Sequence, residues 1–172
     1  METQEQTPGK FSVNYGLILG AIMILISVIQ YVTGMALEGT NWPTYLYYII
    51  FPAVIIYAIS VYKKNNNGFL TLSNAIKIGL IIAIISALVN IVYGIVFNYF
   101  IDPEFTGKII EMTGEKLLEN PNVTPEMVET QMEMMEKFQN PIFGFTIWLA
   151  LSAFFGLVYS LIGGLIMKKE EE

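Results

Sequence analysis

Four long stretches of the chain carry no charged side chain, and short polar segments separate them. These stretches cover residues 11–37, 44–62, 78–101 and 142–167. A helix needs about 20 apolar residues to cross a hydrocarbon layer about 30 Å thick, and lipid offers its backbone no hydrogen-bond partner. The pattern therefore predicts an all-α polytopic membrane protein with four transmembrane helices, at about residues 11–37, 44–62, 72–101 and 142–167.

Composition agrees with this pattern. Hydrophobic residues form 54% of the chain and charged residues 14%, against about 25% charged in a typical soluble domain. We expect all 172 residues to form one membrane domain. The first apolar stretch is longer than the core of a signal peptide, and no convincing cleavage site follows it, so we expect it to be a retained helix. Pro52 predicts a kink in the second helix.

The placement of lysines predicts the orientation in the membrane. Lys63 and Lys64 lie between the second and third helices, Lys77 lies at the start of the third, and Lys168 and Lys169 follow the fourth. With four crossings, these positions share one side, which the positive-inside rule makes cytoplasmic. Both termini are therefore expected in the cytoplasm.

The segment 102–141 lies on the opposite side and is acidic. It holds nine acidic residues and three lysines, and the sequence predicts two amphipathic helices in it, at about 104–119 and 125–138. Asp102, Thr124 and Asn140 each precede a proline, as helix N-caps often do. We expect the glutamates to face water, and the methionines opposite them to pack on the partner helix or rest on lipid headgroups.

Small residues recur every four positions in three of the predicted transmembrane helices. Such ridges let helix backbones approach closely, although lipid provides no hydrophobic driving force between helices. We interpret them as packing surfaces within one bundle, and the alternative is an interface with a second copy or another protein. The packing candidates are Gly16, Gly20, Gly79, Ala83, Gly156, Ser160 and Gly164.

The polar groups predicted within the membrane are uncharged. Gln30 lies in the first helix, and Asn90 and Asn98 lie two turns apart in the third. We expect the two asparagines to hydrogen-bond to neighbouring helices, while the alternative is a polar groove for a ligand or ion. A charged residue in these stretches would have pointed to a transport pathway or a proton relay.

The residue inventory excludes several kinds of chemistry. The chain has no Cys or His, and all nine basic residues are Lys. Thiolate nucleophiles, imidazole bases and guanidinium clamps are therefore absent, so we predict no enzyme activity, no catalytic residues, no cofactor and no metal site. Helical rows of glutamate do not supply the looped, converging oxygens of a calcium site. A net charge of −6 argues against nucleic acid as a partner.

Residues 68–105 resemble the central signature of domain-of-unknown-function family 4199, small four-helix membrane proteins of Bacteroidetes. The similar elements are Gly68, Lys77, Gly79 and the Asp102–Pro103 step, together with the acidic outer loop and the lysine pair near the end. The resemblance covers nearly the whole chain. It implies a bacterial inner membrane, which would place the loop in the periplasm, and it supplies no catalytic residues.

We therefore expect a multi-pass protein of the cell inner membrane without catalytic activity. Our leading hypothesis is an accessory or interaction protein of the cell envelope that presents the outer helical pair to a periplasmic protein partner. The alternative hypothesis is a subunit of an oligomeric transporter or pore, with Asn90 and Asn98 at a shared interface. Partners beyond the lipid bilayer would then be further copies of the chain.

Overall fold

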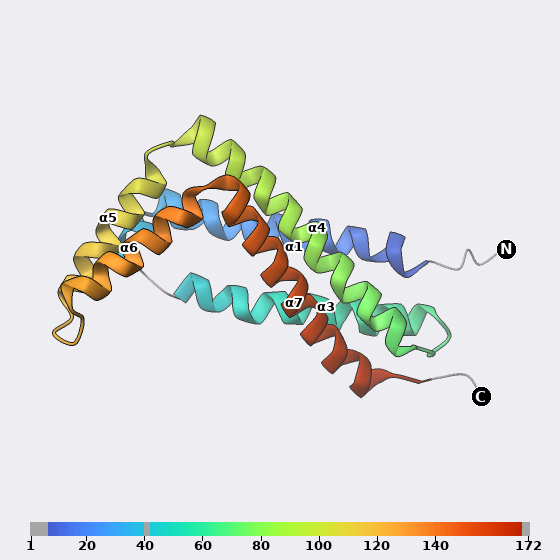
Figure 1. Ribbon diagram of the computed structural model, residues 1–172. Coiled ribbons are helices and arrows are strands. Elements are labelled where there is room, and N and C mark those ends of the chain that lie inside the picture. The colour runs from blue at the N-terminus through green and yellow to red at the C-terminus, as the bar shows by residue number, and fades with distance from the viewer. Residues whose placement is uncertain (1–6, 40–41, 170–172) are drawn as a thin grey trace.

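Helices form almost the entire described chain, and four of them are long and apolar enough to cross a membrane (Figure 1). The computed structural model describes residues 7–39 and 42–169, and not the side chains of Thr44 and Gln139. The four candidates are α1 (Pro8–Val32), α3 (Trp42–Asn65), α4 (Leu72–Val96), which continues into the π-helix η1 (Phe97–Ile101), and α7 (Pro141–Met167). The predicted all-α fold with four candidate membrane-spanning helices is confirmed. The N-terminal flank before Thr7, which entered the signal-peptide prediction, lies outside the described residues.

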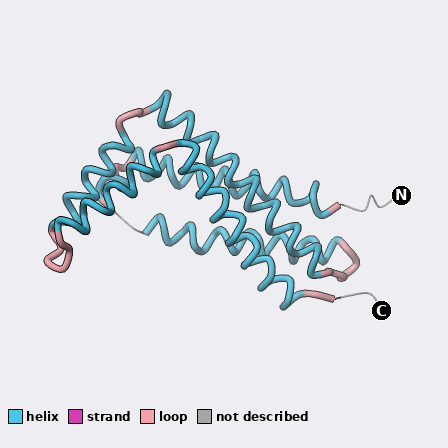
Figure 2. Tube along the Cα trace, in the orientation of Figure 1, coloured by secondary structure: helices cyan, strands magenta, loops and turns pink. Residues whose placement is uncertain are grey.

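The remaining helices lie at one end of the bundle. They are α2 (Met35–Glu38), α5 (Phe105–Leu118) and α6 (Pro125–Gln139). Figure 1 shows α5 and α6 side by side as a helical hairpin, far from the N- and C-terminal ends of the chain. We call this end of the bundle the hairpin end and the opposite one the terminal end. The tube in Figure 2 shows short turns between α4 and α5, between α5 and α6, and between α6 and α7.

The first transmembrane helix is shorter than predicted. It was expected to continue to Leu37, but α1 ends at Val32. Thr33 caps the helix, with its hydroxyl donating to the carbonyl oxygen of Ile29 (2.6 Å), and Gly34 adopts a left-handed conformation with φ of 75°. A left-handed glycine after the last turn is a common way to end a helix. The uncharged residues that follow form the separate short helix α2.

Helix α4 packs between α1 and α7 through small residues, and α3 contacts all three helices. A Cβ atom built on Gly79 would lie 2.3 Å from the Cβ of Ser160, and one on Gly156 would lie 2.5 Å from the Cβ of Ala83. The α4 and α7 backbones therefore approach too closely to leave room for a side chain at either glycine. On the α1 side, Ile85 fills the space over Gly16.

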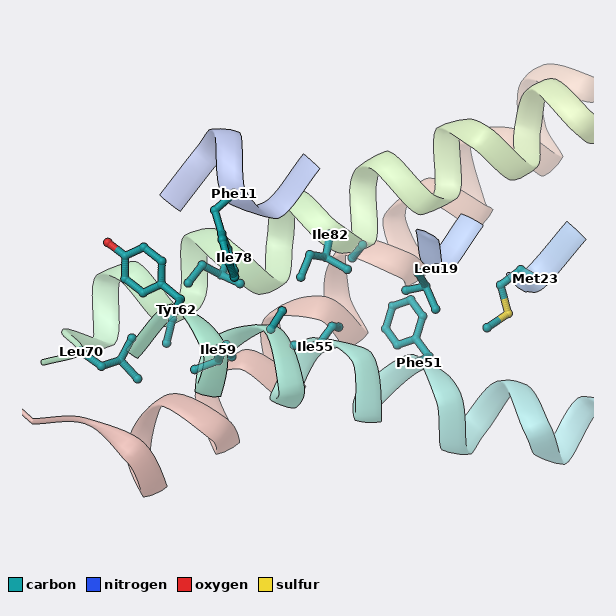
Figure 3. Close-up of a cluster of buried hydrophobic side chains, with 13 residues drawn as sticks. Phe11, Leu19, Met23, Phe51, Ile55, Ile59, Tyr62, Leu70, Ile78 and Ile82 are labelled. Atoms are coloured by element: carbon teal, nitrogen blue, oxygen red, sulfur yellow. The ribbon is translucent and has the colours of Figure 1, made fainter. Parts of the chain in front are cut away.

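The apolar core lies between the helices toward the terminal end (Figure 3). Leu19 from α1, Ile55 and Ile59 from α3, and Ile78 and Ile82 from α4 are fully buried. Protein interiors are closely packed, so each of these side chains fits only against neighbours of matching shape. Their packing therefore favours one arrangement of the helices.

The terminal end is closed by contacts between the α3–α4 turn and the end of α7. Leu70 and Lys169 form a two-way backbone bridge, with N···O distances of 2.8 and 3.0 Å. The ammonium group of Lys63 donates to the carbonyl oxygen of Met167 (2.8 Å). A cation at this position also interacts favourably with the negative end of the α7 dipole. These contacts fix the end of α7 beside α3.

Replacement of Gly156 by alanine should destabilise the bundle, because the new methyl group must displace the Ala83 side chain or the α4 backbone. We expect a loss of about 1–3 kcal/mol in the free energy of unfolding, as for other overpacked cores. Steric trapping of the reconstituted protein measures this quantity. The matched control is Gly94→Ala in α4, where the nearest atom, Cε1 of Phe145, lies 4.0 Å from the built Cβ. Equal stability of the two variants would contradict the close contact between α4 and α7.

Candidate functional site

The predicted packing residues lie inside the single chain. Gly79, Ala83, Gly156, Ser160 and Gly164 meet along the contact between α4 and α7, where the built Cβ of Gly164 lies 2.8 Å from that of Ala75. Gly16 and Gly20 lie on α1 against Ile85 and Val89 of α4. All seven are buried without any second copy of the chain. They position the helices and leave no small-residue face of their own for a ligand or a partner.

The predicted polar residues of the membrane segments are not brought together as one group. The side-chain amide of Asn90 donates to the carbonyl oxygen of Ser86 in its own helix (2.9 Å), so this bond does not join two helices as expected. Asn98 also donates within the helix, to Gly94 (2.9 Å), but its amide oxygen accepts a bond from the Thr106 hydroxyl of α5 (2.5 Å). Gln30 is partly exposed on α1. Asn98 alone therefore lies at a junction between elements.

This junction joins the hairpin to the bundle. The π-helical turn η1 carries Asn98, and the first turn of α5 carries Thr106. The Tyr31 hydroxyl of α1 donates to a carboxylate oxygen of Asp102 (3.2 Å) in the connection between η1 and α5. The rings of Tyr31, Phe97 and Phe105 pack edge to face, with the Phe97 and Phe105 centroids 4.9 and 5.0 Å from that of Tyr31. Polar and aromatic contacts together fix the root of α5.

Asp102 has a different role from the predicted one. It was expected to cap α5, but the residue before α5 is Glu104, and the N-cap makes no side-chain hydrogen bond. The Asp102 carboxylate faces Tyr31 and lies 4.0 Å from the Lys108 ammonium group, which also lies 3.4 Å from Glu104. The predicted caps at Thr124 and Asn140 are confirmed, because each accepts backbone hydrogen bonds at its helix start.

Two further contacts hold the hairpin. Lys116 of α5 donates to the carbonyl oxygen of Glu38 at the end of α2. At the other side, α6 ends at Gln139 and α7 begins at Pro141, so a single residue joins the hairpin to the last transmembrane helix. The hairpin is therefore attached to α1, α2, η1 and α7.

The interior of the hairpin is apolar and its outer surface is acidic. Ile110 and Gly114 of α5 and Val128 of α6 are buried, and the sulfur of Met132 lies 3.0 Å from a Cβ built on Gly114. Met132 thus packs on α5, whereas Met134, one of the methionines expected on the packing face, is 57% exposed. Eight glutamates are exposed on the hairpin and its connections: Glu104, Glu111, Glu115, Glu119, Glu126, Glu129, Glu133 and Glu136. Across the described residues, no group of three or more acidic, His or Cys side chains could hold a metal ion.

Two open cavities flank the bond between Asn98 and Thr106. One of about 290 Å³ lies toward α6 and α7 and includes Phe138 and Phe145. The other, of about 220 Å³, lies toward α1 and includes Tyr31 and Tyr93. The sequence singled out Asn98 but not Tyr31 or Thr106, because nothing in the local pattern shows which distant residue meets the end of α4.

Thr106→Val should loosen the start of α5, because Asn98 loses the donor to its amide oxygen. A hydrogen bond of this kind contributes about 0.5–1.5 kcal/mol, so we expect amide exchange in the first turns of α5 to accelerate by about two- to tenfold. Hydrogen–deuterium exchange with mass spectrometry measures the rate. Thr130→Val is the control, since the Thr130 hydroxyl donates within α6 to Glu126 (2.9 Å). If α5 exchanges equally fast in both variants, the Asn98–Thr106 bond does not anchor the hairpin.

Comparison with known proteins assigns the chain to a family without assigning an activity. A family model described as "Protein of unknown function (DUF4199)" matches residues 14–169, as the sequence resemblance predicted. No curated protein and no solved structure matches the chain. The match extends from the first half of α1 to the end of α7 and covers the whole hairpin. The chain therefore belongs to the DUF4199 family.

Proposed function

We propose that this protein is a non-enzymatic interaction protein of the bacterial inner membrane, and that the α5–α6 hairpin is the docking surface for a periplasmic protein partner. The observation that supports this proposal is that the hairpin is attached to the bundle at four places. A surface that is already ordered loses little conformational entropy when it binds. An unattached loop of the same composition would lose more.

The charge on the hairpin indicates the kind of partner. All eight exposed glutamates are available to solvent, and the exposed apolar side chains of Leu118, Met127 and Met134 lie on the same two helices. Methionine is a flexible apolar residue that adapts to the shape of a partner. A partner with lysines or arginines around a small apolar surface would be complementary, and electrostatic attraction would accelerate its association.

The lysine distribution supports the proposed orientation. The terminal end carries Lys63, Lys64, Lys168 and Lys169, and the hairpin end carries the acidic surface. The positive-inside rule then places the terminal end in the cytoplasm. A negatively charged hairpin would also be repelled by the anionic surface of a cytoplasmic leaflet.

The structure offers less support to an oligomeric pore. The small-residue ridges that a second copy would need are buried between α1, α4 and α7 of one chain. The Asn90 amide is bonded within its own helix. We therefore retain the interaction protein as the single proposed function.

Orientation is tested by single cysteines, because the natural chain has none. Asn122→Cys places a thiol at the exposed tip of the hairpin, and Asn65→Cys places one at the exposed end of α3. In intact spheroplasts, we expect a membrane-impermeant maleimide to label Cys at 122 and to label Cys at 65 only after lysis. The reverse labelling would place the hairpin in the cytoplasm and refute a periplasmic partner.

Docking is tested by photo-crosslinking in living cells with benzoylphenylalanine at Thr130, an exposed position of α6. We expect a discrete protein adduct that becomes about tenfold weaker when the four α6 glutamates are changed to glutamine, since the attraction to a basic partner is lost. A probe at Ile162, on the exposed apolar surface of α7, is the control and should give no such adduct. An adduct that persists in the glutamine variant, or that forms equally at Ile162, would contradict docking through the acidic surface.

A further inference from the structure

An apolar groove lies between α3 and α7, and its lining shares no residue with the hairpin junction. It has a volume of about 140 Å³ and is open on one part of its surface. The floor includes Phe51, which is 3% exposed, and the rim includes Tyr48, which is 59% exposed, and Leu151. An apolar cavity of about 150 Å³ is large enough to take up a molecule of the size of benzene. The groove therefore has room for a segment of a hydrocarbon chain or a small ring.

Aromatic rings line the groove and hold its walls in place. Tyr47 of α3 lies between Phe51, stacked with its ring centroid at 5.5 Å, and Trp148 of α7, at 5.8 Å. Phe51 in turn meets Tyr159 of α7 edge to face at 6.1 Å. These contacts join α3 and α7 along the lining of the groove.

Two hydroxyl groups interrupt the apolar lining. Ser152 is only 4% exposed, and Ser152 and Tyr47 both line the groove. Each of the two hydroxyl groups carries one O–H hydrogen that it can donate. Polar groups are scarce in the membrane-spanning segments of this chain. The two hydroxyl groups therefore give the apolar groove wall a place where a ligand can form a hydrogen bond.

Pro52 in the groove wall lacks the backbone donor that any other residue would have. Proline has no N–H group, so it cannot donate to the carbonyl oxygen of Tyr48 four residues earlier. Both residues line the groove. The sequence predicted that Pro52 would kink α3. Because Pro52 also lies in the groove wall, it removes one backbone N–H donor next to the cavity.

We propose that this groove is a lipid-binding site that holds one acyl chain of a phospholipid, with the Tyr47–Ser152 hydroxyl pair donating to a carbonyl oxygen of the ester linkage. Both walls belong to candidate membrane-spanning helices, so the solvent that reaches the opening is lipid. A hydrocarbon chain matches the aromatic walls, and a carbonyl oxygen is the acceptor that a membrane lipid carries next to its chain. This site lies outside the proposed docking surface and does not depend on it.

Quenching of tryptophan fluorescence by brominated lipids tests this inference, because one of the two tryptophans of the chain, Trp148, lines the groove. Trp42→Phe leaves Trp148 as the single reporter. The protein is reconstituted with dioleoyl phosphatidylcholine and increasing fractions of its chain-brominated form, ester-linked or ether-linked. We expect the ester-linked lipid to associate at Trp148 about threefold more tightly than the ether-linked one, as for one hydrogen bond within a membrane protein.

The control moves the tryptophan to Phe154, an exposed α7 side chain that does not line the groove, in the background Trp42→Phe and Trp148→Phe. There we expect no preference between the two lipids. Tyr47→Phe and Ser152→Ala, each tested separately with Trp148 as reporter, should remove the preference while leaving the helical circular dichroism unchanged. Equal association at positions 148 and 154, no difference between ester and ether lipids, or a preference that persists in both hydroxyl variants would each overturn the proposal.

Discussion

The close approach of the α4 and α7 backbones is the constraint on which the other features depend. In lipid, apolar side chains gain nothing by leaving the surrounding hydrocarbon, so helices must be held together by close packing and hydrogen bonds. Gly79 and Gly156 provide that packing, since each occupies a position where a methyl group would collide with the opposite helix. Gly16 and Gly20 allow α1 the same approach from the other side. Helix α4 becomes the centre of the bundle because small residues allow a close contact on both sides, those of α1 against Ile85 and Val89 and those of α4 and α7 against each other.

The same constraint explains where openings remain. Helix α3 lacks a row of small residues, and it meets α7 through large aromatic rings such as Tyr47 and Phe51. Rings joined at centroid distances of 5–6 Å cannot fill the space between two helices as completely as glycines in direct contact. The groove thus lies at the helix pair with bulky contacts, whereas Gly79 and Gly156 bring α4 and α7 into direct contact.

The sequence predicted the features that depend on local patterns, and it missed those that depend on distant partners. The lengths of the uncharged stretches were sufficient to predict the four spans. Thr124 and Asn140 each precede a proline, which is a recognisable pattern of a helix N-cap. The end of α1 at Val32 was missed, although Thr33 and Gly34 carry a signal for it, because the following uncharged residues concealed the stop. The bond between Asn98 and Thr106 crosses from a π-helical turn to another helix, and no periodicity encodes that pairing.

Helix α7 connects the two proposed binding surfaces, the α5–α6 hairpin and the groove between α3 and α7. Its first turn follows the hairpin after a single residue, Asn140, and its middle carries Ser152 in the groove wall and Gly156 in the contact with α4. Ser152 and Gly156 are four residues apart, so they lie on neighbouring parts of one helix face. Helix α7 therefore contacts α4 closely at Gly156 and borders the groove toward α3 at Ser152, one helical turn earlier. The same helix thus belongs to the closest contact of the bundle, to the groove wall and to the attachment of the hairpin.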